Sequence, residues 1–179
     1  MIRIESDRLI IRNFTVNDWE GLARIGMHYE ASELAKYDYG PWPDSPDAYM
    51  EIAKDWSKKN EFVAVQLKKE QTLIGFIAMG QDEAGEYNLG YIFHPEFRGY
   101  GYAFEACQAV IRYLFEVIGV VQILSGTAKV NTSSRKLLKR LGFREHGESK
   151  LSFRKDSEGN PIEFIGIDFM LTREDWMKS

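Results

Sequence analysis

The chain has 179 residues, of which 44% are hydrophobic and 13% aromatic, and its formal net charge at pH 7 is −4. This length suits one domain, residues 1–179, with a substantial core, and the composition excludes an intrinsically disordered chain. The negative charge argues against a general affinity for nucleic acid or an anionic membrane, and no run approaches the roughly 18 apolar residues that cross a bilayer. We therefore expect a cytoplasmic protein with neither nucleic acid nor membrane as a partner.

The first third of the chain predicts one strand and two helices. Apolar residues at residues 9–14 predict a strand, and residues 15–18 resemble the start of a helix. The Ser-Pro-Asp sequence at residues 45–47 predicts the start of a second helix that ends near residue 60. The loop at residues 37–46 is rich in Tyr, Pro, Gly and Trp, so we expect aromatic packing to order it.

Three strands follow at residues 62–68, 72–80 and 87–93, and the short turns between them predict an antiparallel meander. Side chains in a strand alternate between its two faces. In the third strand, the set predicted to face the core is Tyr87, Leu89, Tyr91 and Phe93. The opposite face carries Glu86, Asn88, Gly90 and Ile92.

A glycine-rich turn joins this strand to the next helix. Gly99 and Gly101 allow the backbone to fold back so that successive N–H groups point into one hollow, and the N-terminal pole of the helix adds partial positive charge. Arg98 adds a full charge at the rim. No Gly-Lys-Ser/Thr follows and GxGxxG is incomplete, which argues against a Walker loop and a dinucleotide fingerprint. The turn predicts a pyrophosphate site, with a plain tight turn as the alternative.

The second half continues this pattern. The helix after the turn extends to about residue 118 and holds the single cysteine, Cys107, among apolar residues, so we expect a buried thiol rather than a nucleophile. A β-rich run at residues 120–126, a short basic helix at 133–140 and a hairpin pairing 143–153 with 162–171 complete the chain. We expect no metal site, because the three histidines lack ligand spacing: His28, His94 and His146.

Two motifs stand in a fixed order along the chain. Residues 98–103 read Arg-Gly-Tyr-Gly-Tyr-Ala and precede Glu105 and Ala106, and residues 131–134 read Asn-Thr-Ser-Ser ahead of Leu-Gly-Phe at 141–143. Together they resemble the acyl-CoA-binding segments of the GNAT N-acetyltransferases, in particular the branch of the ribosomal-protein alanine acetyltransferases. The resemblance implies an α+β (mixed α/β) domain with a mostly antiparallel twisted sheet of about six to seven strands and about four helices.

The resemblance also implies that acetyl-CoA is the cosubstrate and that the turn binds its pyrophosphate. The backbone around Ile92 and Phe93 would bond the pantetheine as though it were an added strand. Asn131 would contact the pantetheine and Ser134 would lie near the sulfur as a proton donor, although both residues also suit a plain helix cap. The implied cosubstrate-binding residues are Ile92, Phe93, Arg98, Gly99, Tyr100, Gly101, Tyr102, Ala103, Asn131 and Ser134.

The catalytic residues depart from the family at one position. Related proteins often carry a glutamate two residues before the Gly-Tyr pair, where this chain has Asn88, which accepts no proton. Glu86 lies on the same face and either acts as a base through a water or is simply exposed. With Ser134 as the acid, these three residues are the catalytic candidates.

The family resemblance implies direct attack by an amine in a ternary complex, with the early helices flanking the acceptor cleft. The resemblance favours a protein N-terminal α-amine as the acceptor, with a small-molecule amine as the second choice. The alternative is an acyl-CoA-binding sensor or interaction module without turnover, for which Asn88 is the motivating residue. We expect a monomer or a homodimer, since the final hairpin offers an edge through which homologous domains can dimerise.

A basic cluster lies between residues 129 and 144 with no acidic residue among them. It is either a solvated helix face or a group of charges near the phosphates of CoA. Its members are Lys129, Arg135, Lys136, Lys139, Arg140 and Arg144.

Overall fold

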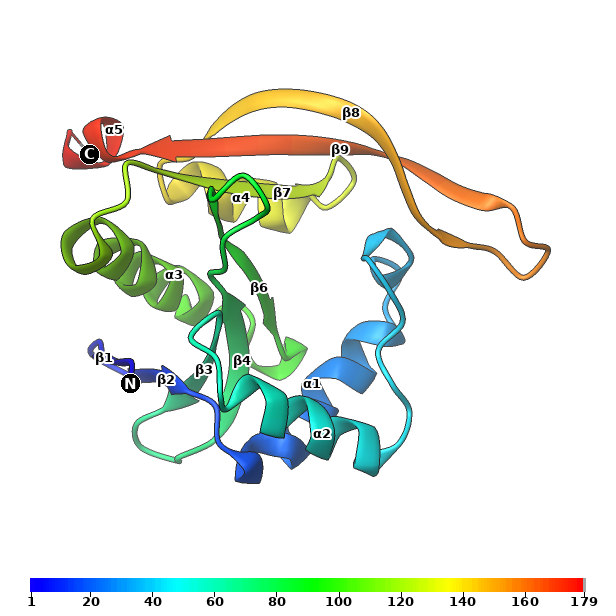
Figure 1. Cartoon of the computed structure of the whole chain (residues 1–179), viewed down its shortest axis with the longest axis horizontal. Coiled ribbons are helices and arrows are strands. Elements are labelled where there is room, and N and C mark those ends of the chain that lie inside the picture. The colour runs from blue at the N-terminus through cyan, green and yellow to red at the C-terminus, as the bar shows by residue number, and fades with distance from the viewer. Residues whose placement is uncertain (179) are drawn as a thin grey trace.

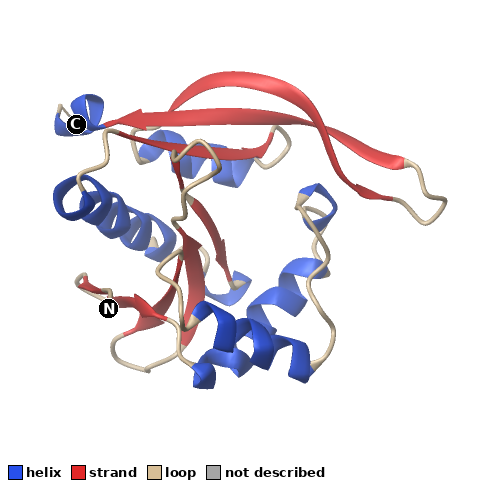
Figure 2. Cartoon of the chain, in the orientation of Figure 1, coloured by secondary structure: helices blue, strands red, loops and turns tan. Residues whose placement is uncertain are grey.

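The structure is a computed structural model that describes residues 1–178, and its strands form two sheets (Figures 1 and 2). The five-stranded sheet is antiparallel, in the order β1-β2-β3-β4-β6. The other has the order β5-β7-β9-β8, in which only the β5–β7 pair is parallel. The strands are β1 (Arg3–Glu5), β2 (Leu9–Asn13), β3 (Phe62–Leu67), β4 (Leu73–Ala78), β5 (Tyr87–Asn88), β6 (Gly90–Phe93), β7 (Gln122–Ala128), β8 (Arg144–Lys155) and β9 (Pro161–Thr172).

The described residues contain five α-helices: α1 (Trp19–Glu30), α2 (Pro46–Trp56), α3 (Tyr102–Tyr113), α4 (Thr132–Arg140) and α5 (Arg173–Met177). Short 3-10 helices precede or join them: η1 (Val16–Asp18), η2 (Ala35–Tyr37) and η3 (Pro95–Phe97). Local sequence sets several ends. The Ser45 hydroxyl accepts the Ala48 N–H at the start of α2, as its Ser-Pro sequence predicts. Beyond α3, a π-helical turn (Leu114–Ile118) ends where Gly119 takes a φ of 81°.

Helices cover both faces of the five-stranded sheet (Figure 1). Along β3, Val63 and Val65 pack in a core shared with α3 and α4, whereas Ala64 packs in a core shared with α1 and α2. Both sets of alternating side chains are therefore buried, which explains why β3 and β4 read as continuous apolar runs.

The predicted α+β class and mostly antiparallel strand pairing are confirmed. The strands divide into two sheets rather than the one central sheet that was expected, because residues 87–93 form two strands. β5 pairs with β7, and β6 pairs with β4. The short elements β1 and α5 were not predicted, since three and five residues are too few to show a periodicity.

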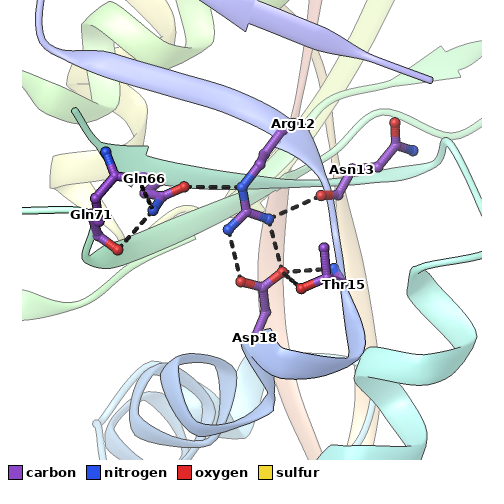
Figure 3. A network of polar contacts seen from close by, with 6 residues as sticks. All are labelled: Arg12, Asn13, Thr15, Asp18, Gln66 and Gln71. Carbon is purple, nitrogen blue, oxygen red and sulfur yellow. Dashed lines mark hydrogen bonds and ion pairs between the residues drawn. The ribbon is translucent and has the colours of Figure 1, made fainter.

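A polar network fastens the start of α1 to the sheet (Figure 3). Arg12 on β2 donates to both carboxylate oxygens of Asp18 at 2.8 Å, and its Nε donates to Gln66 on β3 at 2.9 Å. The side chains of Arg12 and Asp18 are only 21% and 9% exposed. Although burial alone raises the pKa of Asp18, hydrogen bonds from Arg12 and Thr15 hold it below its ordinary value.

Asp18→Asn should lower the free energy of unfolding at pH 7 by about 2 kcal/mol, because it removes the ion pair and keeps an oxygen for Thr15. Since the folded-state pKa of Asp18 is depressed, its contribution is present above the unfolded-state pKa and is lost as pH falls through the folded-state pKa. The free energies of unfolding of wild type and variant, measured by urea melts, should therefore converge as pH falls below the unfolded-state pKa of about 3.9 and through the folded-state pKa.

Asp55→Asn is the matched control, because it breaks the exposed ion pair between Asp55 on α2 and Lys59. Its urea midpoint should match that of the wild type. A difference between Asp18→Asn and wild type that stays constant from pH 7 to pH 2 would contradict the assignment.

Candidate active site

The central feature of the candidate site is the point at which the strand after residue 86 changes partners. Tyr87 and Asn88 pair with Ile123 and Leu124 of β7. Leu89 then donates its N–H to the Leu124 carbonyl at 2.8 Å. Among residues 1–178, the strand from Gly90 onward pairs with β4 alone, and β6 is one of the two edge strands of its sheet. β6 and β7 therefore separate after Leu89, and Figure 1 shows the two labelled strands diverging.

The edge of β6 that faces the separation presents main-chain polar groups. Asn88 and His94 donate their N–H groups toward β4, to Gly80 and Ile74, both at 2.9 Å. Because N–H directions alternate along an antiparallel strand, Ile92 also faces β4, and Tyr91 and Phe93 direct their N–H groups to the open edge. The geometry thus favours Phe93 over Ile92 as a main-chain donor to a ligand, and adds Tyr91, which the sequence argument had placed only in the core.

The glycine turn that follows β6 has the predicted conformation. Gly99 and Gly101 have φ values of 84° and 81°, in the left-handed region that favours glycine. Gly101 is the N-cap of α3 and no side chain caps this end of the helix. The first N–H groups of α3, from Tyr102 and Ala103 onward, are thus available to an anion, and Arg98 is exposed beside them.

The turn is entered through a buried histidine. His94 is 6% exposed, and its Nδ1 accepts the Glu96 N–H at 3.3 Å, which starts η3. Burial and the nearby Arg24 hold the pKa of His94 below its ordinary value. A small cavity of about 50 Å³ lies between α1 and this segment, lined by Ile25, His28, Tyr29, Ser32, Phe93, Pro95 and Arg98.

Tyr91 and Ser134 meet across the separation. The Ser134 hydroxyl, in the first turn of α4, lies 2.9 Å from the Tyr91 hydroxyl on β6. Burial raises the pKa of Tyr91, so this phenol stays protonated at neutral pH. Asn131 caps α4, since its Oδ1 accepts the Ser134 N–H at 3.1 Å. The cap role foreseen for Asn131 is therefore present, and its amide nitrogen is left to donate.

Glu86 and Asn88 do not join this pair. Glu86 accepts a hydrogen bond from Gln122 at 2.8 Å, and lies four residues, or about 13 Å of strand, before Gly90. The Asn88 amide donates to Asp82 at 3.2 Å and to the Glu86 carbonyl at 3.2 Å. The Asn88 side chain thus holds the turn before β5 and the Glu86 side chain is bonded to β7, so neither joins the Tyr91–Ser134 pair.

The basic cluster is largely paired with acids that sequence spacing could not reveal. Lys129 pairs with Glu148, Arg135 and Lys139 pair with Glu145, and Arg144 pairs with Asp175. Arg140 instead lies 4.0 Å from the ring centroid of Phe104 in the first turns of α3, which places one cation of the cluster near the glycine turn.

Cys107 is completely buried, and burial raises the pKa of its thiol, which confirms the predicted core position.

Within residues 1–178, no three side chains among His, Cys, Asp and Glu gather as a metal site would require. In the same part of the chain, each helix is too short or too polar to span a membrane.

The sequence matches a family model described as an acetyltransferase (GNAT) domain over residues 8–144. YnaD, an uncharacterized N-acetyltransferase of Bacillus subtilis, is 30% identical over 159 residues, which cover 88% of this chain and 91% of that protein. A GNAT-family acetyltransferase structure from Bacillus anthracis has a TM-score of 0.81 at 22% identity, covering 97% of this chain and 99% of its own. The ribosomal-protein-S5-alanine acetyltransferase of Vibrio fischeri has a TM-score of 0.75 at 20% identity, covering 98% and 99%.

Asn131→Ala should lower the free energy of unfolding by about 1 kcal/mol, because it removes the N-cap of α4. Asn131→Asp is the matched variant: it keeps the capping oxygen and removes only the amide donor, so its stability should stay close to that of the wild type. Urea melts measure both. An equal loss in the two variants would show that the cap contributes nothing.

Proposed function

Because the chain belongs to the GNAT acetyltransferase family, whose members transfer an acetyl group from acetyl-CoA to an amine, we propose that it acetylates a protein N-terminal α-amine by direct attack in a ternary complex. The observation that carries this proposal is the separation of β6 from β7 next to the glycine turn. It offers a strand edge to an extended ligand and a helix N-terminus to an anionic one.

Both ends of acetyl-CoA suit this arrangement. The pantetheine arm carries amides, which can bond the outward N–H and C=O groups of Tyr91 and Phe93 as an added strand would. The pyrophosphate suits the N–H groups of residues 99–103 and the charge of Arg98. An outward N–H of β6 near the thioester carbonyl would also stabilise the oxyanion of the tetrahedral intermediate.

The absence of a side-chain base at the family position favours an α-amine as the acceptor. Asn88 accepts no proton, and Glu86 is held by Gln122 before the strands separate. At pH 7 roughly 15% of an α-amine is neutral, against roughly 0.04% of a lysine side chain. An α-amine can therefore lose its proton to solvent before it attacks, whereas a lysine depends more heavily on a base.

The departing thiolate requires a proton, and the hydroxyl pair can supply it. As the C–S bond breaks, the Ser134 hydroxyl donates its proton to the sulfur and takes up the proton that the attacking amine nitrogen releases. The Tyr91 hydroxyl, 2.9 Å away, orients Ser134 and stays protonated. The thiol has an ordinary pKa near 8.5, so a weak acid held in place is sufficient.

The segments expected to flank the acceptor amine are α1, the loop after it and the β8–β9 hairpin. Their surface suits the end of a protein chain better than a small molecule. Arg154 on β8 donates to Glu30 at the end of α1 at 2.7 Å and to the Asp38 carbonyl in the next loop, which ties the hairpin to that loop. Tyr39 is 80% exposed and lies 4.4 Å from Phe153, between ring centroids. The cavity beside α1 holds about 50 Å³, which is too small to enclose a drug-sized molecule.

Thiol release from acetyl-CoA, measured across a panel of amines, should be fastest with peptides that carry a free N-terminus. The same peptides with a blocked N-terminus and a free lysine side chain should react at least tenfold more slowly at pH 7, because so little of the lysine amine is neutral. Faster turnover of polyamines or amino sugars would contradict the α-amine assignment. Tight acetyl-CoA binding without turnover of any amine would favour the sensor function that Asn88 also suggests.

Ser134→Ala should lower kcat about 10- to 100-fold and change KM for acetyl-CoA little, because the hydroxyl acts on the departing thiolate. Ser133→Ala, on the exposed side of the same helix turn, is the control and should keep the wild-type kcat. An unchanged kcat in Ser134→Ala would remove this residue from the mechanism.

A further inference from the structure

Arg8 contacts the glycine turn although it lies near the start of the chain, 92 positions before Tyr100. It immediately precedes β2, and its Nη1 donates to the Tyr100 carbonyl at 2.9 Å. Tyr100 stands between the two glycines with positive φ. The guanidinium of Arg8 also lies 4.4 Å from the ring centroid of Tyr102, the first residue of α3. One side chain thus contacts both the turn and the helix that follows it.

The same guanidinium pairs with Glu105 in the first turns of α3. Arg8 Nε donates to Oε2 of Glu105 at 2.7 Å, and Nη2 lies 2.7 Å from the same oxygen. The other oxygen, Oε1, accepts the Arg8 N–H at 2.8 Å and the Ser6 hydroxyl at 2.7 Å. Although partial burial alone raises the pKa of Glu105, these bonds hold it below its ordinary value, so the carboxylate is ionised at neutral pH.

An ionised carboxylate at this position would oppose an anion at the same helix end. The N-terminal pole of α3 attracts negative charge, and Glu105 already supplies one such charge within that pole. Arg8 neutralises it at contact distance. By bonding the Tyr100 carbonyl, Arg8 also fixes the direction of that oxygen, so that it faces the guanidinium.

We propose that Arg8 is a positioning residue that sets the glycine turn for the pyrophosphate of acetyl-CoA and cancels the charge of Glu105 beneath it. This role rests on the proposed function, because it assigns the pyrophosphate to that turn. Arg8 is 46% exposed and lies outside the apolar core, so its contacts serve the turn more than the packing of the sheet.

The test compares two ligands that differ in the pyrophosphate. Dissociation constants of acetyl-CoA and of S-acetylpantetheine, which lacks the nucleotide and pyrophosphate, are measured by NMR titration, which reads Kd values into the millimolar range. Arg8→Ala should raise Kd for acetyl-CoA about tenfold and leave Kd for S-acetylpantetheine unchanged. Arg8→Lys should fall between, since lysine keeps the charge but cannot bond Tyr100 and Glu105 together.

A double variant separates the two parts of the role. Arg8→Ala with Glu105→Gln should regain part of the lost acetyl-CoA affinity, because the uncompensated charge is gone. Arg3→Ala, which breaks an exposed pair with Glu5 on β1, is the control and should bind both ligands as the wild type does.

The proposed role of Arg8 would be overturned if Arg8→Ala and Arg8→Lys changed the Kd for acetyl-CoA and the Kd for S-acetylpantetheine by the same factor. It would also be overturned if they changed neither Kd. If the double variant bound acetyl-CoA more weakly than Arg8→Ala does, the proposal that Arg8 compensates the charge of Glu105 would be overturned. Failure of the wild type to bind acetyl-CoA would instead overturn the proposed function, and the role of Arg8 with it.

Discussion

The site depends on one strand that must serve two sheets. Up to Leu89 this strand pairs with β7, and the Leu89 carbonyl is the last group bound there, by the Ser125 hydroxyl at 2.7 Å rather than by a main-chain N–H. Beyond it, β6 packs closely on β4. A Cβ at Gly75 would lie 2.5 Å from the Phe93 ring and 2.7 Å from the Ile92 carbonyl, so glycine permits this approach. The open edge of β6 therefore arises because pairing with β7 ends at Leu89 and because Gly75 lets the strand lie close to β4.

The two walls of the separation are held from different directions. On the α4 side, Asn131 caps the helix and the Ser134 hydroxyl meets Tyr91, which fixes the distance between β6 and α4. On the α3 side, Arg8 and Glu105 connect the start of β2 to the glycine turn. Under the proposed function, acetyl-CoA would meet a surface whose polar groups are already oriented, which would reduce the entropy lost on binding.

The sequence predicted what local physics determines and missed what distant contacts determine. The glycine turn, the Ser45 cap and the burial of Cys107 follow from residue type and short spacing, and all three are present. The division at Leu89 was not predictable, because Tyr87 to Phe93 alternates as one strand and only pairing partners separate β5 from β6. Arg8 meets Glu105 across 97 positions, a separation at which no periodicity signals contact. Tyr91 was predicted to be a core residue, and its ring does pack against the core. Only its hydroxyl reaches Ser134.

The central claim is that acetyl-CoA completes the open edge of β6 as an added strand. Amide hydrogen exchange, followed by NMR residue by residue with and without saturating acetyl-CoA, tests this most directly, because Ile92 is an internal reference already bonded toward β4. The account predicts that the Phe93 and Tyr91 amides, or at least the one bonded by the pantetheine, slow markedly while Ile92 changes little. Exchange at both outward amides that stays unchanged at saturation would contradict it.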